Sequence, residues 1–253
     1  MKIIIRMVGA ELHYIKLNSV TKKLNKKKIL DEVSFNIPKG EITAFLGPNG
    51  AGKTTTLKIL SGLLDYDDGE ILINNQNFKK HTEEVMFIPD IPFMYPELTG
   101  REFIDFTIDL FNVRIKPQEI EDFIKKFKLE NEVHKQISQH SFGTKKKIAL
   151  LTTLIKRPNL LLLDEFISGI DPVNLKTIKD ILIDYSSEGN TVFISTHQLE
   201  VVQSFCHNVI LLNNGRIIND ILKIRDVLES NHTLEDYFIN QIEVSEGIEA
   251  IFQ

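Results

Sequence analysis

Residues 47–54 read GPNGAGKT, and this octet decides the fold of the 253-residue chain. It directly follows the strand-like segment EITAFL (residues 41–46) and directly precedes the helix-like segment TTTLKIL (residues 54–60). The octet fits the pattern G-x-x-x-x-G-K-[ST], whose glycines let backbone N–H groups turn inward around an anion. The first turn of the helix adds free N–H groups and the positive end of a dipole. The segment therefore predicts a binding site for a nucleoside triphosphate.

Two pairs of residues are expected to carry the chemistry of this site. Lys53 is predicted to contact the β- and γ-phosphates, and Thr54 to offer its hydroxyl to Mg²⁺. Further along, LLLLDE (residues 160–165) places Asp164 and Glu165 at the carboxyl end of an apolar strand, where α/β proteins bind ligands. Asp164 is predicted to hold Mg²⁺, directly or through water, and Glu165 to act as the general base toward an attacking water. The residues predicted to line the phosphate site are Gly47, Pro48, Asn49, Gly50, Ala51, Gly52, Lys53, Thr54 and Thr55.

Composition argues against several other classes of protein. The net charge is −5 and the lysines are scattered, which argues against a nucleic acid as the main partner. Cys206 is the only cysteine, so no intrachain disulfide can form and a reducing cytosol is expected. No apolar run reaches the roughly 18–20 residues that a membrane-spanning helix needs, and Arg6 interrupts the apolar start of the chain. If the protein serves a membrane, we expect the membrane part to be another polypeptide.

Strand-like stretches alternate with helical ones, and this alternation predicts an α/β sheet. LLLL at 160–163 is apolar on both faces, as a central parallel strand covered by helices on each side requires. The strand-like stretches are residues 14–20, 41–46, 70–73, 85–88, 160–163, 191–195 and 209–212.

Two helices can be placed from the pattern of apolar residues and from capping signals. One covers residues 120–127, where apolar side chains follow the spacing i, i+3, i+4, i+7. Another begins at Asp171 as N-cap with Pro172 in its first turn, and ends near Gly189. No convincing strand lies between about residues 91 and 155. The predicted organisation is therefore a nucleotide-binding core of residues 1–90 and 156–222, an inserted helical subdomain of residues 91–155, and a helical tail of residues 223–253.

The motifs together resemble the ATP-binding subunits of ABC transporters. GPNGAGKTTT and LLLLDEFISGIDP carry the resemblance, and GEITAFLGPNG, SGLLDYDDGEILI, YPELTGREF and ISTHQLEVV extend it over roughly residues 14–218. It implies ATP and Mg²⁺ as cofactors and a P-loop NTPase core, with a mainly parallel sheet, N-terminal antiparallel strands and an inserted helical subdomain. It also implies that His197, at the end of the strand TVFIS, contacts the γ-phosphate and joins Lys53 and Glu165 in catalysis.

The segment HSFGT at residues 140–144 stands where this family carries its signature, commonly LSGGQ. In the family this loop caps the γ-phosphate of ATP bound to the opposite subunit, which implies nucleotide contacts from Ser141 and Gly143. Asp171, in the segment after the acidic strand, is expected to belong to the same set. Phe142 replaces a glycine and puts a ring where close approach is needed. The three lysines that follow are interpreted as a solvated helix face.

Two further positions depart from the family pattern. Asp90 stands where the family usually has a glutamine of the Mg²⁺ shell, and its carboxylate is still suited to Mg²⁺ or a water bound to it. Leu24 aligns with the aromatic residue that commonly stacks on adenine. Loss of that stack is predicted to weaken base binding by roughly 0.5–1.5 kcal/mol, and with it the discrimination between ATP and GTP. An ordinary apolar contact by Leu24 fits the sequence equally well.

The resemblance implies an ATPase that dimerises around two ATP, with itself or with a second ABC ATPase subunit. It would drive separate transmembrane permease subunits from the cytoplasmic face of the cell membrane. YPELTGREF together with Asp90 resembles bacterial exporters of peptides or drugs more than importers. The apolar cluster at residues 93–95 either docks a helix of the membrane partner or packs inside the helical subdomain.

Three alternatives compete with the transporter motor. An ABC-type ATPase acting on ribosomes would carry two cassettes, and only one glycine loop is present. A P-loop kinase would lack the signature, the segment after the acidic strand and His197. A nucleotide-gated dimerising or regulatory module with weak hydrolysis stays open because of Phe142 and Asp90, although Glu165 and His197 argue against it.

Overall fold

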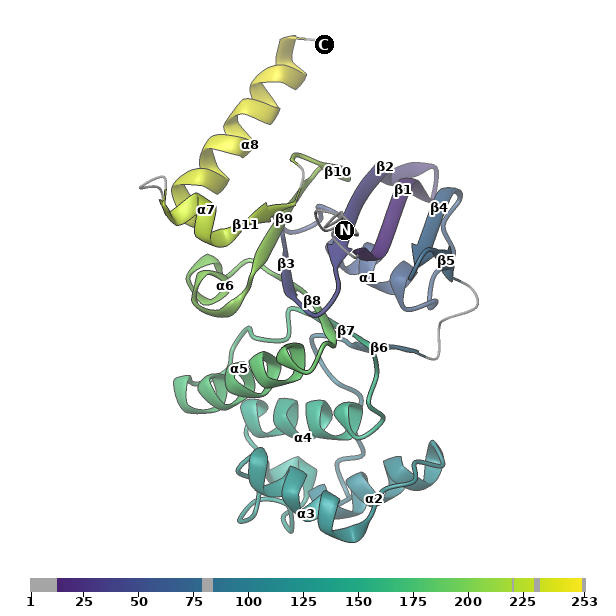
Figure 1. Ribbon diagram of the computed structural model, residues 1–253, viewed down its shortest axis with the longest axis vertical. Helices are drawn as coiled ribbons and strands as arrows, with labels where there is room; N and C mark the ends of the chain where they lie inside the picture. Colours follow the sequence, from purple (N-terminus) through teal and green to yellow (C-terminus); the bar gives the residue numbers. More distant parts are fainter. Residues whose placement is uncertain (1–12, 79–83, 220, 230–232, 252–253) are drawn as a thin grey trace, which may run out of the picture.

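The computed structural model describes residues 13–78, 84–219, 221–229 and 233–251 (Figure 1). The first dozen residues, including Arg6, lie outside this range. In Figure 1 the antiparallel sheet lies at the upper right, helices α2, α3 and α4 lie together at the bottom, and α8 projects at the top. The parallel strands run between these regions.

A sheet of seven strands forms the centre, and its order is β10-β9-β3-β8-β7-β6, with β11 also paired to β9. The pairs from β9 to β6 are parallel, whereas β10 and β11 run antiparallel to β9. Every residue of β3, β7, β8 and β9 is buried, as the apolar run at 160–163 predicts. The strands are β3 Ile42–Leu46, β6 Val85–Ile88, β7 Leu160–Asp164, β8 Thr191–Thr196, β9 Asn208–Asn213, β10 Arg216–Ile217 and β11 Leu222–Lys223.

A second, antiparallel sheet has the order β2-β1-β4-β5. Its strands are β1 His13–Leu24, β2 Lys27–Pro38, β4 Asp68–Ile73 and β5 Gln76–Asn77. Strand β2 is not among the strand-like stretches predicted from the sequence. Its first two residues are exposed, and Glu32 interrupts the alternation with a φ of 53°. Only from Val33 onward do buried side chains alternate regularly, at Val33, Phe35 and Ile37.

Three phenylalanines join the two sheets. The ring centroid of Phe35 on β2 lies 5.6 Å from that of Phe45 on β3 and 5.6 Å from that of Phe193 on β8. Phe45 and Phe193 are 5.0 Å apart. Because each ring buries a large apolar area, this cluster fixes the antiparallel sheet against one face of the parallel sheet. The antiparallel sheet is thereby held next to the loop that follows β3.

Helices cover the sheets and form the lower region. Residues 91–155 contain three α-helices and no named strand among the described elements, in agreement with their helical pattern. Asp171 caps α5 by accepting hydrogen bonds from the N–H groups of Val173 and Asn174, with Pro172 at the first helical position, as expected. No helix in the part of the chain that the structure describes is long and apolar enough to cross a membrane. The helices are α1 Lys53–Leu60, α2 Gly100–Leu110, α3 Pro117–Lys126, α4 Phe142–Leu154, α5 Pro172–Ser187, α6 Leu199–Phe205, α7 Ile224–Glu229 and α8 Leu234–Ile251.

Candidate nucleotide-binding site

The loop between β3 and α1 is the predicted phosphate site, and two of its glycines have no room for a side chain. A Cβ on Gly47 would lie 2.2 Å from the backbone oxygen of Leu212. Gly52 has a φ of 114°, and a Cβ there would lie 2.7 Å from Cδ2 of Leu30. The loop therefore forms a tight arch in which only residues without a Cβ fit at these two positions. An arch of this kind, followed by a helix N-terminus, fits an anion.

The ammonium of Lys53 lies inside this arch. It donates to the backbone oxygens of Gly47 (2.7 Å) and Pro48 (3.2 Å), and its side chain is 6% exposed. Its Nζ also lies 3.6 Å from Oε1 of Glu165. The loop and Lys53 therefore present N–H donors and a cation in one place, as the phosphates of a nucleotide require.

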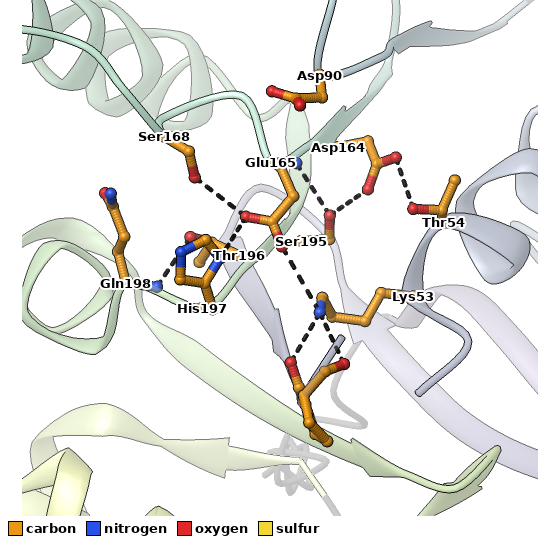
Figure 2. A network of polar contacts seen from close by, with 12 residues as sticks. Lys53, Thr54, Asp90, Asp164, Glu165, Ser168, Ser195, Thr196, His197 and Gln198 are labelled. Atoms are coloured by element: carbon orange, nitrogen blue, oxygen red, sulfur yellow. Dashed lines mark hydrogen bonds and ion pairs between the residues drawn. The ribbon is translucent and has the colours of Figure 1, made fainter. Parts of the chain in front are cut away.

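Asp164 and Thr54 meet across the site, as predicted. The hydroxyl of Thr54 donates to Oδ2 of Asp164 at 2.8 Å, and Ser195 donates to Oδ1 at 2.5 Å (Figure 2). Asp164 is 5% exposed at the last position of β7. The two oxygens of its carboxylate are thus held by hydroxyls from α1 and β8.

These oxygens fit a magnesium ion. Among the residues that the structure describes, no group of three histidines, cysteines or carboxylates lies close enough to hold a metal alone. Mg²⁺ is commonly held by one or two carboxylates together with phosphate oxygens and water. The hydroxyl of Thr54 and the carboxylate of Asp164 would supply the protein's share of such a shell, so the residues present suit the ion only together with a nucleotide.

Glu165 is held by three neighbours. Its Oε2 accepts a hydrogen bond from the hydroxyl of Ser168 (3.1 Å) and lies 2.9 Å from Nδ1 of His197. An ionised carboxylate accepts only, so Nδ1 of His197 carries the proton in this contact. The backbone of Glu165 has a φ of 45°, and its N–H donates to the backbone oxygen of Ser195 (3.0 Å). The carboxylate is thereby fixed beside Lys53 and the phosphate loop.

Ser195 and Ser168 were not found by sequence reasoning. Ser195 contacts both Asp164 and the N–H of Glu165, and Ser168 contacts the carboxylate of Glu165. The available signal was a small polar residue at the carboxyl end of a buried strand, two positions before His197. Ser168 lies in the turn after the acidic pair, where a hydroxyl reaches back three residues.

The interpretation of the three lysines as a solvated face is wrong for two of them. Lys146 is 0% exposed and Lys147 is 5% exposed, whereas Lys145 is half-buried. The ammonium of Lys146 lies 3.3 Å from Oδ1 of Asp90. Burial lowers the pKa of Lys146, and the carboxylate of Asp90 opposes that shift. Asp90 as a magnesium ligand stays a prediction.

The signature segment begins α4. Ser141 is its N-cap and accepts from the N–H of Thr144 (3.2 Å). A Cβ on Gly143 would come within 2.9 Å of Nδ2 of Asn174 and 3.1 Å of Oδ2 of Asp171, so a larger residue here would displace these side chains. Phe142 is 39% exposed, and its ring lies against Gly169. Nucleotide contacts by Ser141, Gly143 and Asp171 remain predictions.

Leu24 ends β1 at the tip of the β1–β2 hairpin, opposite Lys27, and is 42% exposed. An exposed leucine can contact a nucleotide base through its apolar surface alone. Its position neither supports nor contradicts a base contact, which stays a prediction.

The family model described as "ABC transporter" matches residues 30–168, which is more than half of the chain. The chain belongs to the ABC transporter ATP-binding family. The match spans the phosphate loop, the signature segment and the acidic strand, whereas Ser195 and His197 lie beyond its end. The recognition made from the motifs is confirmed, and so is the fold class.

Curated relatives agree with this membership. An uncharacterized ABC transporter ATP-binding protein of Methanocaldococcus jannaschii is 33% identical over 215 residues, which cover 84% of this chain and 79% of that protein. The bacitracin transport ATP-binding protein BcrA of Bacillus licheniformis is 32% identical, covering 82% of this chain and 69% of its own. The lantibiotic transport ATP-binding protein SrtF of Streptococcus pyogenes is 31% identical, covering 90% and 97%.

Solved structures extend the agreement to three dimensions. The ATP-binding subunit of an ABC transporter superposes with a TM-score of 0.79 at 24% identity, covering 90% of this chain and 99% of that one. A dimeric cassette in a post-hydrolysis state bound to ADP and Pi gives a TM-score of 0.73 at 26% identity, covering 83% and 99%. The chain is an ABC ATPase that binds and hydrolyses ATP.

Proposed function

We propose that this chain is the motor subunit of a bacterial ABC transporter that exports peptides or drug-like compounds. Its site supports hydrolysis because the Glu165 carboxylate is oriented by His197 and Ser168 at 2.9 and 3.1 Å beside Lys53. This arrangement is the observation that carries the hydrolytic part of the proposal. The similarity to transport ATP-binding proteins named for bacitracin and lantibiotics supports the substrate class.

The residues divide the chemistry as follows. The arch of residues 47–52 and Lys53 hold the phosphates of ATP. Thr54 and Asp164 would hold Mg²⁺, which would neutralise charge on the phosphate oxygens. Glu165 accepts a proton from the water that attacks the γ-phosphate. His197 orients the Glu165 carboxylate through Nδ1, so orientation of the base and proton transfer are done by different side chains.

The proposed motor works as a dimer, with a second copy or with another ABC ATPase subunit. Ser141 and Gly143 lie at the N-terminus of α4, a helix of 13 residues whose first N–H groups are suited to a phosphate bound to the opposite subunit. Hydrolysis would reopen the dimer and pass the motion to separate permease subunits at the cytoplasmic face of the membrane.

An exposed aromatic cluster is the proposed contact with the permease subunits. We define it as Phe93, Tyr95 and Phe106. Phe93 is 79% exposed, and its ring packs edge-on to Tyr95 with centroids 5.4 Å apart. Tyr95 packs in the same way against Phe106 on α2, also at 5.4 Å. This exposure argues against packing of Phe93 inside the helical subdomain and supports docking of a partner helix.

The first test is the mass of the Glu165→Gln protein in solution, by light scattering after gel filtration, with and without Mg-ATP. The amide keeps the shape of the side chain and removes the base, so ATP binds without turnover. A dimer formed only with Mg-ATP is the expected result. A monomer in both conditions would contradict a homodimeric motor and would point to a second, different cassette.

The rate of hydrolysis and the direction of transport need separate tests. Wild-type turnover well above that of Glu165→Gln is expected, whereas equal slow rates would favour the nucleotide-gated regulatory module. A bacterial host of the gene carrying Glu165→Gln should become more sensitive to bacitracin or to lantibiotics. A new nutrient requirement without that sensitivity would indicate an importer.

A further inference from the structure

The ammonium group of Lys146 lies in the interior, between α4 and the end of strand β7. Its side chain is 0% exposed and is among the largest fully buried side chains of the described residues. A buried lysine is stable only where its charge and its N–H donors are matched. The groups that contact this ammonium therefore indicate the structural role of Lys146.

Three acceptors surround the ammonium and match its three donors. Nζ lies 3.3 Å from Oδ1 of Asp90, 3.2 Å from the backbone oxygen of Glu165 and 3.1 Å from the backbone oxygen of Ser168. The ring of Phe142 covers it with a centroid at 4.3 Å. A cation over an aromatic face is a favourable contact.

The two backbone acceptors are the ends of one turn, residues 165–168, closed by a hydrogen bond from the N–H of Ser168 to the oxygen of Glu165 (3.1 Å). Glu165 has a φ of 45°, a left-handed conformation that residues with a Cβ rarely adopt. Such a conformation persists only where the surroundings hold it. Lys146 bonds to both ends of the turn and so contributes to holding it.

Two of the positions that depart from the ABC pattern meet at this ammonium. Asp90 replaces a glutamine and supplies the only carboxylate that hydrogen-bonds to Lys146 among the described contacts. Phe142 replaces a glycine and supplies the ring. A glutamine has no charge to balance the ammonium, and a glycine has no ring to cover it. The three residues therefore form one unit, which we name the Lys146 unit (Asp90, Phe142 and Lys146).

We propose that Lys146 is a positioning residue, which fixes the turn of residues 165–168 and through it the Glu165 carboxylate, with Asp90 and Phe142 holding its ammonium in place. The inference rests on the proposed role of Glu165 as the base. The polar contacts of Lys146 are to Asp90 and to the backbone of the turn. Lys146 connects α4, which carries the signature segment, to the backbone of Glu165.

The test compares Lys146→Met with Lys156→Met in the full chain. Methionine keeps the length of the side chain and removes the ammonium. Lys156 is a matched control because its ammonium also lies over a ring, 3.6 Å from the centroid of Phe111, without contacting the turn. For Lys146→Met we expect kcat to fall about 10- to 100-fold, the scale of a misplaced catalytic group. The Kd of Mg-ADP, measured by calorimetry, should stay within about twofold, and Lys156→Met should match the wild type in both.

Asp90→Asn tests the unit even if Lys146→Met does not fold. If Asp90 acts by holding Lys146, Asp90→Asn lowers kcat and leaves the Mg²⁺ concentration for half-maximal rate unchanged. In the double variant with Lys146→Met, Asp90→Asn lowers kcat no further, because the effects of substitutions at contacting residues are not additive. A higher Mg²⁺ requirement with normal kcat at saturation would overturn the proposal and make Asp90 a magnesium ligand.

The outcomes separate this inference from the proposed function. Wild-type kcat in Lys146→Met, with Glu165→Gln inactive, overturns the positioning role and leaves the motor intact. Wild-type kcat in Glu165→Gln overturns the role of the base, and the positioning role with it. The positioning role is also overturned if Lys146→Met loses Mg-ADP binding by the same factor as kcat. Lys146 would then stabilise the whole nucleotide site and not the position of Glu165.

Discussion

The hydroxyl of Ser195 connects the two acidic residues of the site. It donates a 2.5 Å hydrogen bond to Oδ1 of Asp164 and accepts a 3.1 Å bond from the N–H of Glu165. Ser195 is 0% exposed. One side chain on β8 thus fixes two groups. The first is the carboxylate of Asp164, which is predicted to hold Mg²⁺, and the second is the backbone N–H of Glu165, the predicted base.

Ser195→Ala is expected to lower both stability and magnesium use. It leaves the buried oxygen of Asp164 without this donor, which costs about 1–3 kcal/mol in the free energy of unfolding. The Mg²⁺ concentration for half-maximal ATPase should rise, because the carboxylate is no longer oriented. Urea denaturation and a magnesium titration measure the two effects. Ser187→Ala, an exposed serine on α5, should change neither; equal effects from both would refute the assignment.

His197→Ala is expected to lower kcat about 100-fold, within the range for a group that assists proton transfer. The reason is the 2.9 Å contact between its Nδ1 and Oε2 of Glu165, which orients the carboxylate. Mg-ADP binding should change little, because the phosphate loop is untouched. Phosphate release at saturating ATP is the measurement, and His134→Ala, an exposed histidine, is the control. A fall of less than threefold would rule out this orienting role.

Motif spacing was enough to predict that the acidic and the phosphate-loop residues lie together. The glycine loop and LLLLDE each sit on an element whose neighbours are close in sequence, so Lys53, Thr54, Asp164 and Glu165 could be placed from local pattern and parallel-strand logic. Their meeting at 2.8 and 3.6 Å follows because parallel strands end at one edge.

The contacts of Lys146 could not be predicted in this way. Three consecutive lysines are typical of a solvated helix face, and which of them turns inward depends on the rotation of α4 against the core. Its acceptors come from residues 90, 165 and 168, which no spacing rule connects. The strand β2 was missed for a related reason: its polar start and the irregular position at Glu32 hide the alternation that pairing with β1 creates.

His140→Leu is expected to remove a pH dependence of stability. The side chain of His140 is 0% exposed, and neither ring nitrogen has a hydrogen-bond partner among the described residues, although Oε2 of Glu132 lies 3.4 Å from Nδ1. Burial lowers the pKa of His140, against opposing effects of the Glu132 carboxylate and of the Lys135 backbone. The folded state therefore favours the neutral ring.

The sign follows from linkage. The unfolded chain binds the proton more readily, so the contribution of His140 is full above its ordinary pKa of about 6.5 and is lost as pH falls toward the lowered folded pKa. Wild type should lose up to about 1.4 kcal/mol per pH unit in that window relative to His140→Leu. Denaturation at pH 7.5, 6.5 and 5.5 measures it. A parallel pH response in His140→Leu would contradict the prediction, and exposed His134→Leu should keep the wild-type response.

Leu24→Tyr is expected to strengthen ATP binding by roughly 0.5–1.5 kcal/mol, because a ring would stack on adenine where a leucine offers only apolar area. That equals about a 2- to 12-fold lower Kd. The wild type should accept GTP nearly as well as ATP. Competition binding with both nucleotides measures this, and Leu63→Tyr, on a leucine that is 68% exposed, is the control. A wild type that uses ATP alone would refute it.

Alanine at Phe93 and Tyr95 is expected to uncouple the ATPase from its membrane partner. The two rings pack edge-on with centroids 5.4 Å apart, and Phe93 is 79% exposed, so their loss removes an apolar anchor without opening the core. An aromatic anchor contributes about 2 kcal/mol, which weakens partner binding about 30-fold. Basal ATPase should stay within about twofold of wild type while stimulation by reconstituted permease subunits is lost. Ile183→Ala, on an exposed isoleucine of α5, should keep full stimulation. Intact stimulation in the double variant would exclude this cluster as the docking surface.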